Sequence, residues 1–139
     1  NLKSQKILLT WMIEDHSVFS QVKTYLSPED FTGRIYREVA ELLYKQYEEG
    51  SVNPARILNH FTDEEEHREA ASLFHTKIRE LSTKEEQEKA LKETVIRVKN
   101  HSIEEAGRTL DPTDIRGLQK LMEAKKDLQK LFQMQISIK

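Results

Sequence analysis

The sequence contains no cysteine, which excludes disulfide bonds, thiol catalysis and cysteine-ligated zinc. Only four glycines and three prolines occur among 139 residues, too few for the many turns of an all-β fold. No signal peptide is recognisable, and no apolar run reaches the length of a membrane-spanning helix. The formal net charge is −2, so no overall field attracts the chain to nucleic acid or to an anionic membrane.

Recognisable catalytic motifs are also missing. The glycines are isolated, so no loop can cradle a phosphate, and no serine stands in a nucleophile elbow. Glu64 and His67 form one Glu-x-x-His pair, whereas a carboxylate-bridged metal site needs two helices with such a pair. The five histidines do not have the spacing of zinc ligands. We therefore expect a non-enzymatic chain without cofactor or metal; a metal-dependent helical bundle or an enzyme without a recognisable motif is the alternative.

Two long amphipathic segments dominate the C-terminal part of the chain. Apolar residues recur at helical spacing from Leu91 to Leu110, stop at Asp111-Pro112, and resume from Ile115 to Phe132. Proline is favoured at the first position of a helix and disfavoured inside one, so we expect Asp111 to cap a second helix that begins at Pro112. Two such helices across a tight turn predict an antiparallel helical hairpin.

The N-terminal part predicts a helical bundle. A helix over residues 4–14 is apolar on several sides, so we expect it, with Trp11, at the centre of the core. Further helices are expected where capping residues precede apolar periodicity: after Ser17, from Gly33 to a stop at Gly50, from Asn53-Pro54, and from Thr62 to Leu81. The predicted fold is all-α, with a helical bundle over residues 1–81 and a long helix and C-terminal helical hairpin over residues 82–139.

The end of the sequence has more apolar residues than one helix–helix seam can bury. We expect part of this surface to bind a partner, with basic side chains around it; packing against the bundle is the alternative. The basic residues of this segment are Arg116, Lys120, Lys125, Lys126 and Lys130. The residues expected to contact a partner are Leu118, Leu121, Lys125, Leu128, Leu131, Phe132, Met134, Ile136 and Ile138.

Three segments resemble a known family: ILLTWMI at residues 7–13, LSPEDFT at 26–32 and YREVAELL at 36–43. Together they resemble the C-terminal helicase-binding domain of bacterial DnaG-type primases, especially those of Bacillus-like bacteria. The resemblance covers the whole chain, because a helical bundle followed by a helical hairpin is the architecture of that domain.

The resemblance implies a function in DNA replication in the bacterial cytoplasm. The domain would dock primase onto the N-terminal collar of the replicative hexameric helicase, chiefly through the hairpin, and modulate helicase and priming activity. Primer synthesis by the parent nucleotidyltransferase would belong to a separate domain. Neither strong nucleic-acid binding, nor membrane binding, nor a small-molecule ligand is implied.

Other binding functions fit parts of the same pattern. The N-terminal domain of the helicase itself has a similar fold, but the sequence ends after the hairpin without an interdomain linker. A generic helical interaction module and a helical nucleic-acid-binding module are the remaining alternatives. The first residue is Asn1 rather than Met, so we expect the sequence to be a piece of a longer protein.

Overall fold

The computed structural model describes residues 2–74 and 83–138, and all regular secondary structure in these residues is helical. This confirms the predicted all-α class. The helices are α1 (Leu2–Glu14), α2 (His16–Val22), the 3₁₀ helix η1 (Pro28–Asp30), α3 (Arg34–Glu49), α4 (Pro54–Asn59), α5 (Glu64–Ser72), α6 (Lys84–Thr109) and α7 (Ile115–Gln133).

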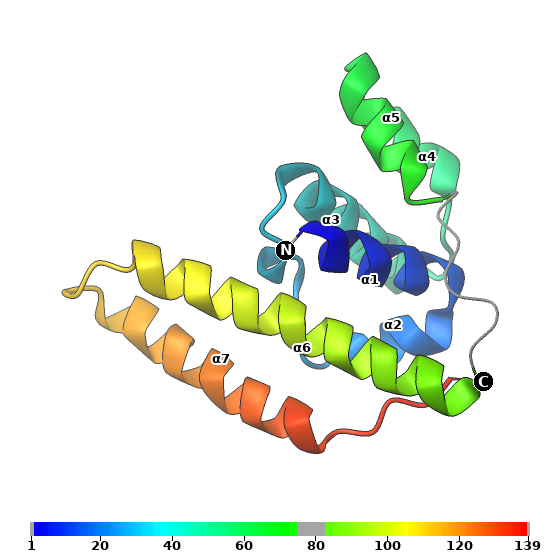
Figure 1. The fold of residues 1–139 in the computed structure, drawn as a ribbon. Coiled ribbons are helices and arrows are strands. Elements are labelled where there is room, and N and C mark those ends of the chain that lie inside the picture. The colour runs from blue at the N-terminus through cyan, green and yellow to red at the C-terminus, as the bar shows by residue number, and fades with distance from the viewer. Residues whose placement is uncertain (1, 75–82, 139) are drawn as a thin grey trace.

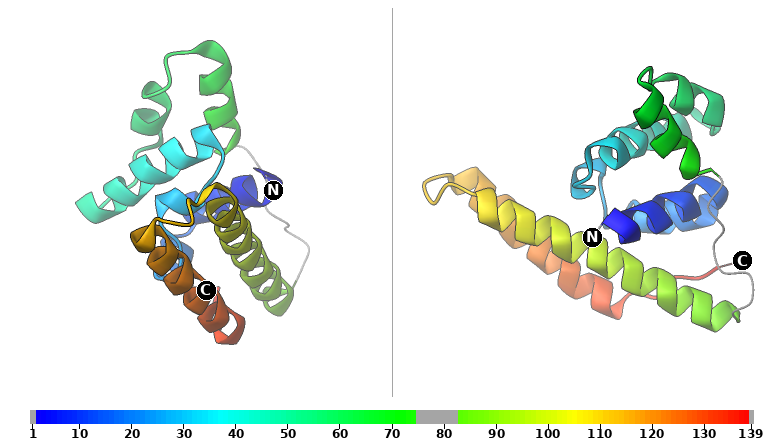
Figure 2. Two further views of the ribbon diagram at one scale, coloured as in Figure 1. Left: turned by 90° about the vertical axis from the view of Figure 1, so that its left-hand side faces the viewer. Right: turned by 45° about the horizontal axis from the view of Figure 1, so that its top comes forward.

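Helix α6 lies between the bundle and α7 (Figure 1). It packs on α1 along one side and antiparallel to α7 along another, while α4 and α5 pack on α3 at the far side of the bundle. The end of the hairpin that carries the α6–α7 turn extends away from the other helices in the views of Figures 1 and 2. The hairpin therefore has one end against the bundle and one end surrounded by solvent.

The core of the protein is continuous across α6. One cluster of fully buried apolar side chains contains Leu8 and Met12 of α1, Leu91 and Val95 of α6, and Leu131 of α7. Trp11 is 7% exposed, in agreement with its predicted place in the core. The predicted boundary between residues 81 and 82, and the predicted inward positions of Ile78 and Leu81, lie outside the described residues.

Helices α3, α4 and α6 have well-defined capping residues, and those of α3 and α4 are the predicted ones. Gly50 ends α3 with φ of 108°, a left-handed conformation that favours glycine. The side chain of Asn53 accepts a hydrogen bond from the backbone N–H of Arg56 at the start of α4. Thr83 caps α6 in the same way by accepting from Glu86.

The predicted cap of α2 is wrong by two residues. Asp15 is the capping residue, because its carboxylate accepts hydrogen bonds from the backbone N–H groups of Ser17 and Val18. Ser17 is therefore already inside the helix. An ionised carboxylate is a stronger acceptor than a hydroxyl at a helix N-terminus, which explains the preference.

The predicted start of α7 at Pro112 is also wrong. The carboxylate of Asp111 accepts from the backbone N–H and the hydroxyl of Thr113, 2.9 and 2.8 Å away, and these bonds lower the pKa of Asp111. Asp111 thus shapes the turn. Helix α7 begins at Ile115, because Asp114 accepts from the N–H of Gly117 at 2.9 Å and is the cap.

Two glycines of the hairpin provide a test of its geometry. A methyl group added at Gly107 would lie 3.8 Å from Leu121 Cδ2, an ordinary contact, whereas at Gly117 it would lie 2.5 Å from Leu110 Cδ1 and 2.6 Å from Asp114 Oδ2. Gly107→Ala should therefore raise the free energy of unfolding by about 0.5–1 kcal/mol through helix propensity. Gly117→Ala should lower it by about 1 kcal/mol, because it displaces the capping side chain.

Urea unfolding followed by circular dichroism measures both changes. Both variants are glycine-to-alanine changes in one hairpin, so the effect of the substitution on the unfolded chain is similar in both and cancels in the difference between them. A stabilising Gly117→Ala would contradict the described turn.

Candidate partner-binding surface

Helix α7 has an exposed apolar face. Five large apolar side chains are exposed among the described residues, and four of them lie on α7: Ile115 (70%), Leu118 (39%), Met122 (61%) and Phe132 (54%). Positions seven apart lie on the same side of a helix, two turns along. Two neighbouring rows therefore form this surface, which we term the α7 face: one row is Ile115, Met122 and Gln129, and the other is Leu118, Lys125 and Phe132.

A second apolar side of the same helix packs toward α6. Leu131 is fully buried in the core, and Leu128 is partly buried against it. Leu121 lies beside Gly107 of α6. At 100° per residue, this side lies roughly a quarter turn from the α7 face. Contact with α6 therefore leaves the α7 face uncovered.

The nine residues that we expected to contact a partner fall into three groups. Leu118, Lys125 and Phe132 are exposed and form one row of the α7 face. Leu121, Leu128 and Met134 are half-buried. Leu131, Ile136 and Ile138 are buried, so their side chains are not accessible to a partner in this structure.

Two exposed residues were not among those nine. Ile115 and Met122 are the most exposed large apolar side chains of the described chain. The signal for them was the spacing of three and four residues from Ile115 through Leu118 to Met122. The side of α7 that packs on α6 has the same helical spacing at a different position around the helix. Sequence alone did not show which of these two apolar sides of α7 would pack on α6.

Helix α7 is basic. The helix contains five lysines and arginines against Glu123 and Asp127, a net charge of +3. Lys125 lies within the α7 face, and Lys126 next to it is also exposed. A partner surface that covers this face would therefore match it best with an apolar floor and acidic residues around it.

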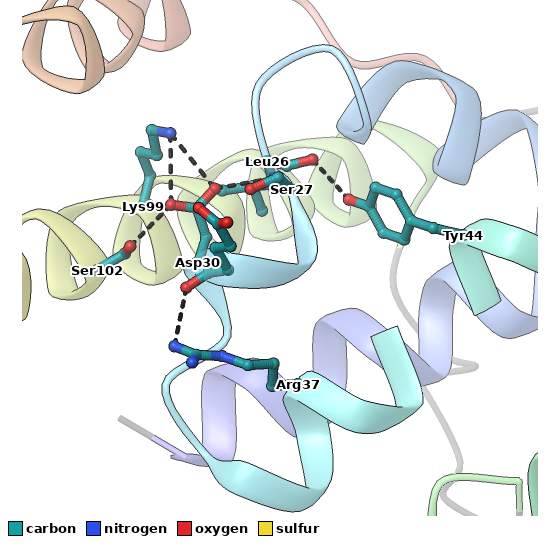
Figure 3. A network of polar contacts seen from close by, with 8 residues as sticks. Leu26, Ser27, Asp30, Arg37, Tyr44, Lys99 and Ser102 are labelled. Atoms are coloured by element: carbon teal, nitrogen blue, oxygen red, sulfur yellow. Dashed lines mark hydrogen bonds and ion pairs between the residues drawn. The ribbon is translucent and has the colours of Figure 1, made fainter. Parts of the chain in front are cut away.

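A buried polar cluster fixes α6 to the bundle (Figure 3). We term it the polar junction: Ser27 and Asp30 from the η1 segment, Lys99 and Ser102 from α6. The Lys99 ammonium lies 3.4 and 3.5 Å from the two carboxylate oxygens of Asp30, and the Ser102 hydroxyl donates to Asp30 at 2.7 Å. The backbone N–H of Ser27 donates to the same carboxylate at 2.9 Å. Lys99 and Asp30 are only 6% and 8% exposed, so each charge depends on the other.

The loop that carries Asp30 is itself held by side chains of α3 (Figure 3). Arg37 donates to the backbone carbonyls of Phe31 and Glu29, at 3.1 and 3.3 Å. The hydroxyl of Tyr44 donates to the carbonyl of Leu26 at 2.6 Å. Burial, and to a smaller degree the negative charge of Asp30, raise the pKa of Tyr44 well above its ordinary value.

No sequence motif indicated the polar junction. The available signal was Lys99, a lysine four residues after Val95 and eight after Leu91 on the apolar side of the helix. Helix α6 continues through residues 100–102 without interruption.

An open groove of about 840 Å³ lies beside the polar junction, between the η1 segment and the hairpin. Its walls include Glu29 and Arg37 from the bundle side and Leu121 and Ala124 from α7. The width of the groove therefore depends on where α7 sits relative to the bundle.

Within residues 2–74 and 83–138, no group of three histidine, aspartate or glutamate side chains is placed to hold a metal ion. No helix in this part of the chain is long and apolar enough to cross a membrane. Comparisons with protein-family models, with curated proteins and with solved structures find no match. Support for a function therefore comes from the α7 face and from the resemblance of three segments.

The polar junction makes a prediction about stability. Lys99→Met leaves the carboxylate of Asp30 buried without a counter-charge and should lower the free energy of unfolding by about 3 kcal/mol. The double variant Lys99→Met/Asp30→Asn removes the buried charge as well and should recover part of this loss. Lys89→Met, an exposed lysine of the same helix, is the matched control and should change stability by less than about 0.5 kcal/mol. Equal effects at positions 89 and 99 in urea unfolding would contradict the junction.

Tyr44 predicts a loss of stability at alkaline pH. Its pKa is higher in the folded protein than the value of about 10 in the unfolded chain, so folding favours the protonated phenol. Stability should be constant up to about pH 10 and should fall as the pH rises further toward the folded pKa. Tyr44→Phe should cost about 1 kcal/mol at pH 7 and make the decline above pH 10 less steep. An unchanged alkaline slope in urea midpoints measured from pH 7 to 12 would refute this role.

Proposed function

We propose that the chain is a non-catalytic interaction domain that docks a bacterial primase onto the N-terminal collar of the replicative hexameric helicase. The observation that carries this proposal is the α7 face: four exposed large apolar side chains on one helix of an otherwise charged hairpin. Docking would modulate helicase and priming activity, and primer synthesis would belong to a separate domain of the parent protein.

The α7 face has the form used in helix-in-groove recognition. Ile115, Leu118 and Met122 stand at positions i, i+3 and i+7, the spacing by which an amphipathic helix fills an apolar groove. Covering them would release water at about 25 cal/mol per Å² of apolar surface, before the costs of association are subtracted. The hairpin presents this face on the side of α7 that α6 does not cover, so a partner needs no rearrangement of the core to reach it.

Charge favours a different partner over a second copy of the same chain. Two α7 faces in contact would bring two helices of net charge +3 together, and like charges across an interface weaken it. An acidic rim on the partner would instead attract Lys125 and Lys126. The helicase collar is therefore proposed to contribute an apolar groove bordered by carboxylates.

The three segments that resemble primase domains lie in the packed bundle and not on the proposed contact surface. Residues 7–13 form the mostly buried centre of α1, and residues 26–32 contain η1 and the buried Phe31. Residues 36–43 lie in α3 and contain its buried side chains Tyr36, Val39, Ala40 and Leu43. Their similarity reports how the bundle is packed. The choice of contact residues comes from the exposure of α7.

The proposal is tested by measuring binding of the chain to a purified hexameric replicative helicase from a Bacillus-type bacterium, by calorimetry or surface plasmon resonance. Leu118→Ala/Met122→Ala should weaken binding at least about tenfold, because apolar anchors carry most of the energy of such interfaces. Both side chains are exposed, so the variant should keep the circular dichroism spectrum and urea midpoint of the parent chain. Lys125→Glu should slow association and reverse its dependence on salt.

Glu41→Ala/Lys45→Ala on α3 is the matched control, since both residues are exposed on another helix and should leave affinity unchanged. The proposal fails if the helicase does not bind the chain, or if it binds the α7 variants as tightly as the parent. Retention on single-stranded or duplex DNA with a steep salt dependence would instead favour the nucleic-acid-binding alternative.

A further inference from the structure

The segment after α7 continues past the end of that helix and packs against α2 and the beginning of α6 (Figure 1). Residues 134–138, which we term the tail, run in extended conformation from the end of α7 toward the beginning of α6 (Figure 1). Ile136 and Ile138 are 4% and 8% exposed and belong to the core cluster, whereas Gln135 and Ser137 between them are exposed. This alternation is that of a strand with one side buried, although the tail pairs with no other strand in the described chain.

Side chains take the place of a partner strand. The carboxamide of Gln21 on α2 accepts from the N–H of Ser137 and donates to its carbonyl, both at 2.9 Å. The carboxylate of Glu88 on α6 accepts from the N–H of Ile138 at 2.6 Å. Lys92, one turn further along α6, donates to the carbonyl of Phe132 at 2.8 Å. The tail is thus tied to two helices that are distant from it in sequence.

We propose that the tail is a latch that fixes the position of α7 against the bundle and that opens as a unit while the core stays folded. It has the features of such an element: it is short and extended, the backbone of Ser137 and Ile138 is bonded to side chains of α2 and α6, and two isoleucines supply most of its burial. Phe132 belongs both to the α7 face and to the last turn held by Lys92. Opening of the latch therefore releases the end of α7 and changes the placement of its exposed face.

The latch does not depend on the identity of the partner, so it can be tested on the chain alone. The absence of cysteine allows single-cysteine variants to report accessibility to a thiol reagent without background. Ile138→Cys reports the tail, Gln135→Cys is the exposed control, and Val98→Cys, fully buried on α6, reports opening of the core. Ile138→Cys should react more slowly than Gln135→Cys and faster than Val98→Cys, with little dependence on low concentrations of urea.

Weakening the latch should act selectively. Adding Gln21→Ala/Glu88→Ala removes three hydrogen bonds to the tail and should speed labelling of Ile138→Cys by about tenfold or more, while labelling of Val98→Cys stays within about twofold. Gln129→Ala, an exposed glutamine of α7, is the control and should change neither rate. The proposal is overturned if Ile138→Cys and Val98→Cys share one rate and one urea dependence, or if Ile138→Cys reacts as fast as Gln135→Cys.

The effect on α7 requires a distance measurement. Spin labels on the variant Glu41→Cys/Gln119→Cys, at exposed positions of α3 and α7, report how the hairpin sits on the bundle. Gln21→Ala/Glu88→Ala should broaden this distance distribution, and Gln129→Ala should leave it narrow. The latch would be refuted if Gln21→Ala/Glu88→Ala speeds thiol labelling of the tail but leaves this distance distribution unchanged, because the tail would then open without positioning α7.

Discussion

The structure depends on a single constraint, namely that α6 is buried on two sides at once. Its apolar residues Leu91 and Val95 complete the core of the bundle against α1, while its other side receives α7. A helix in this position cannot slide or rotate without opening both contacts. The polar junction also fixes the position of α6 along the bundle, because Lys99 must pair with Asp30 for either buried charge to be tolerated. The hairpin is therefore anchored along its bundle end, and its turn end is free to meet solvent or a partner.

Irregular segments of the chain are fixed by glutamine side chains. Gln46 accepts from the N–H of Asn53 and donates to its carbonyl, at 2.7 and 3.1 Å, and so ties the loop after α3 to that helix. Gln21 makes the same two-bond arrangement with Ser137 across 116 positions of sequence. A primary amide has one donor side and one acceptor side, so it can replace a neighbouring strand for one residue. The first case stabilises a local turn, and the second determines where α7 ends.

Sequence patterns predicted the helices well because helix formation is local. Helical periodicity, the stop at Gly50 and the cap at Asn53 were sufficient to predict α3 and α4. The apolar residues on several sides of α1 predicted the burial of Trp11. The caps of α2, α5 and α7 were missed because neighbouring residues compete for the same N–H groups; α5, for example, is capped by Asp63 and not by Thr62. The fate of the C-terminal apolar residues depended on long-range contacts. Nothing local distinguishes Ile136, which fills the core, from Met122, which is exposed, until the tail is placed against α2 and α6.

The long separation within the polar junction has a consequence for how the protein is made on the ribosome. Asp30 and Lys99 are 69 positions apart, so a nascent chain that has released α1 to α5 still lacks the helix that completes its core. The emerging bundle would expose the apolar side of α1 and the carboxylate of Asp30 until α6 leaves the exit tunnel. The N-terminal half therefore cannot complete its folding before α6 is synthesised. Until then the nascent chain is most accessible to chaperones and most prone to aggregation.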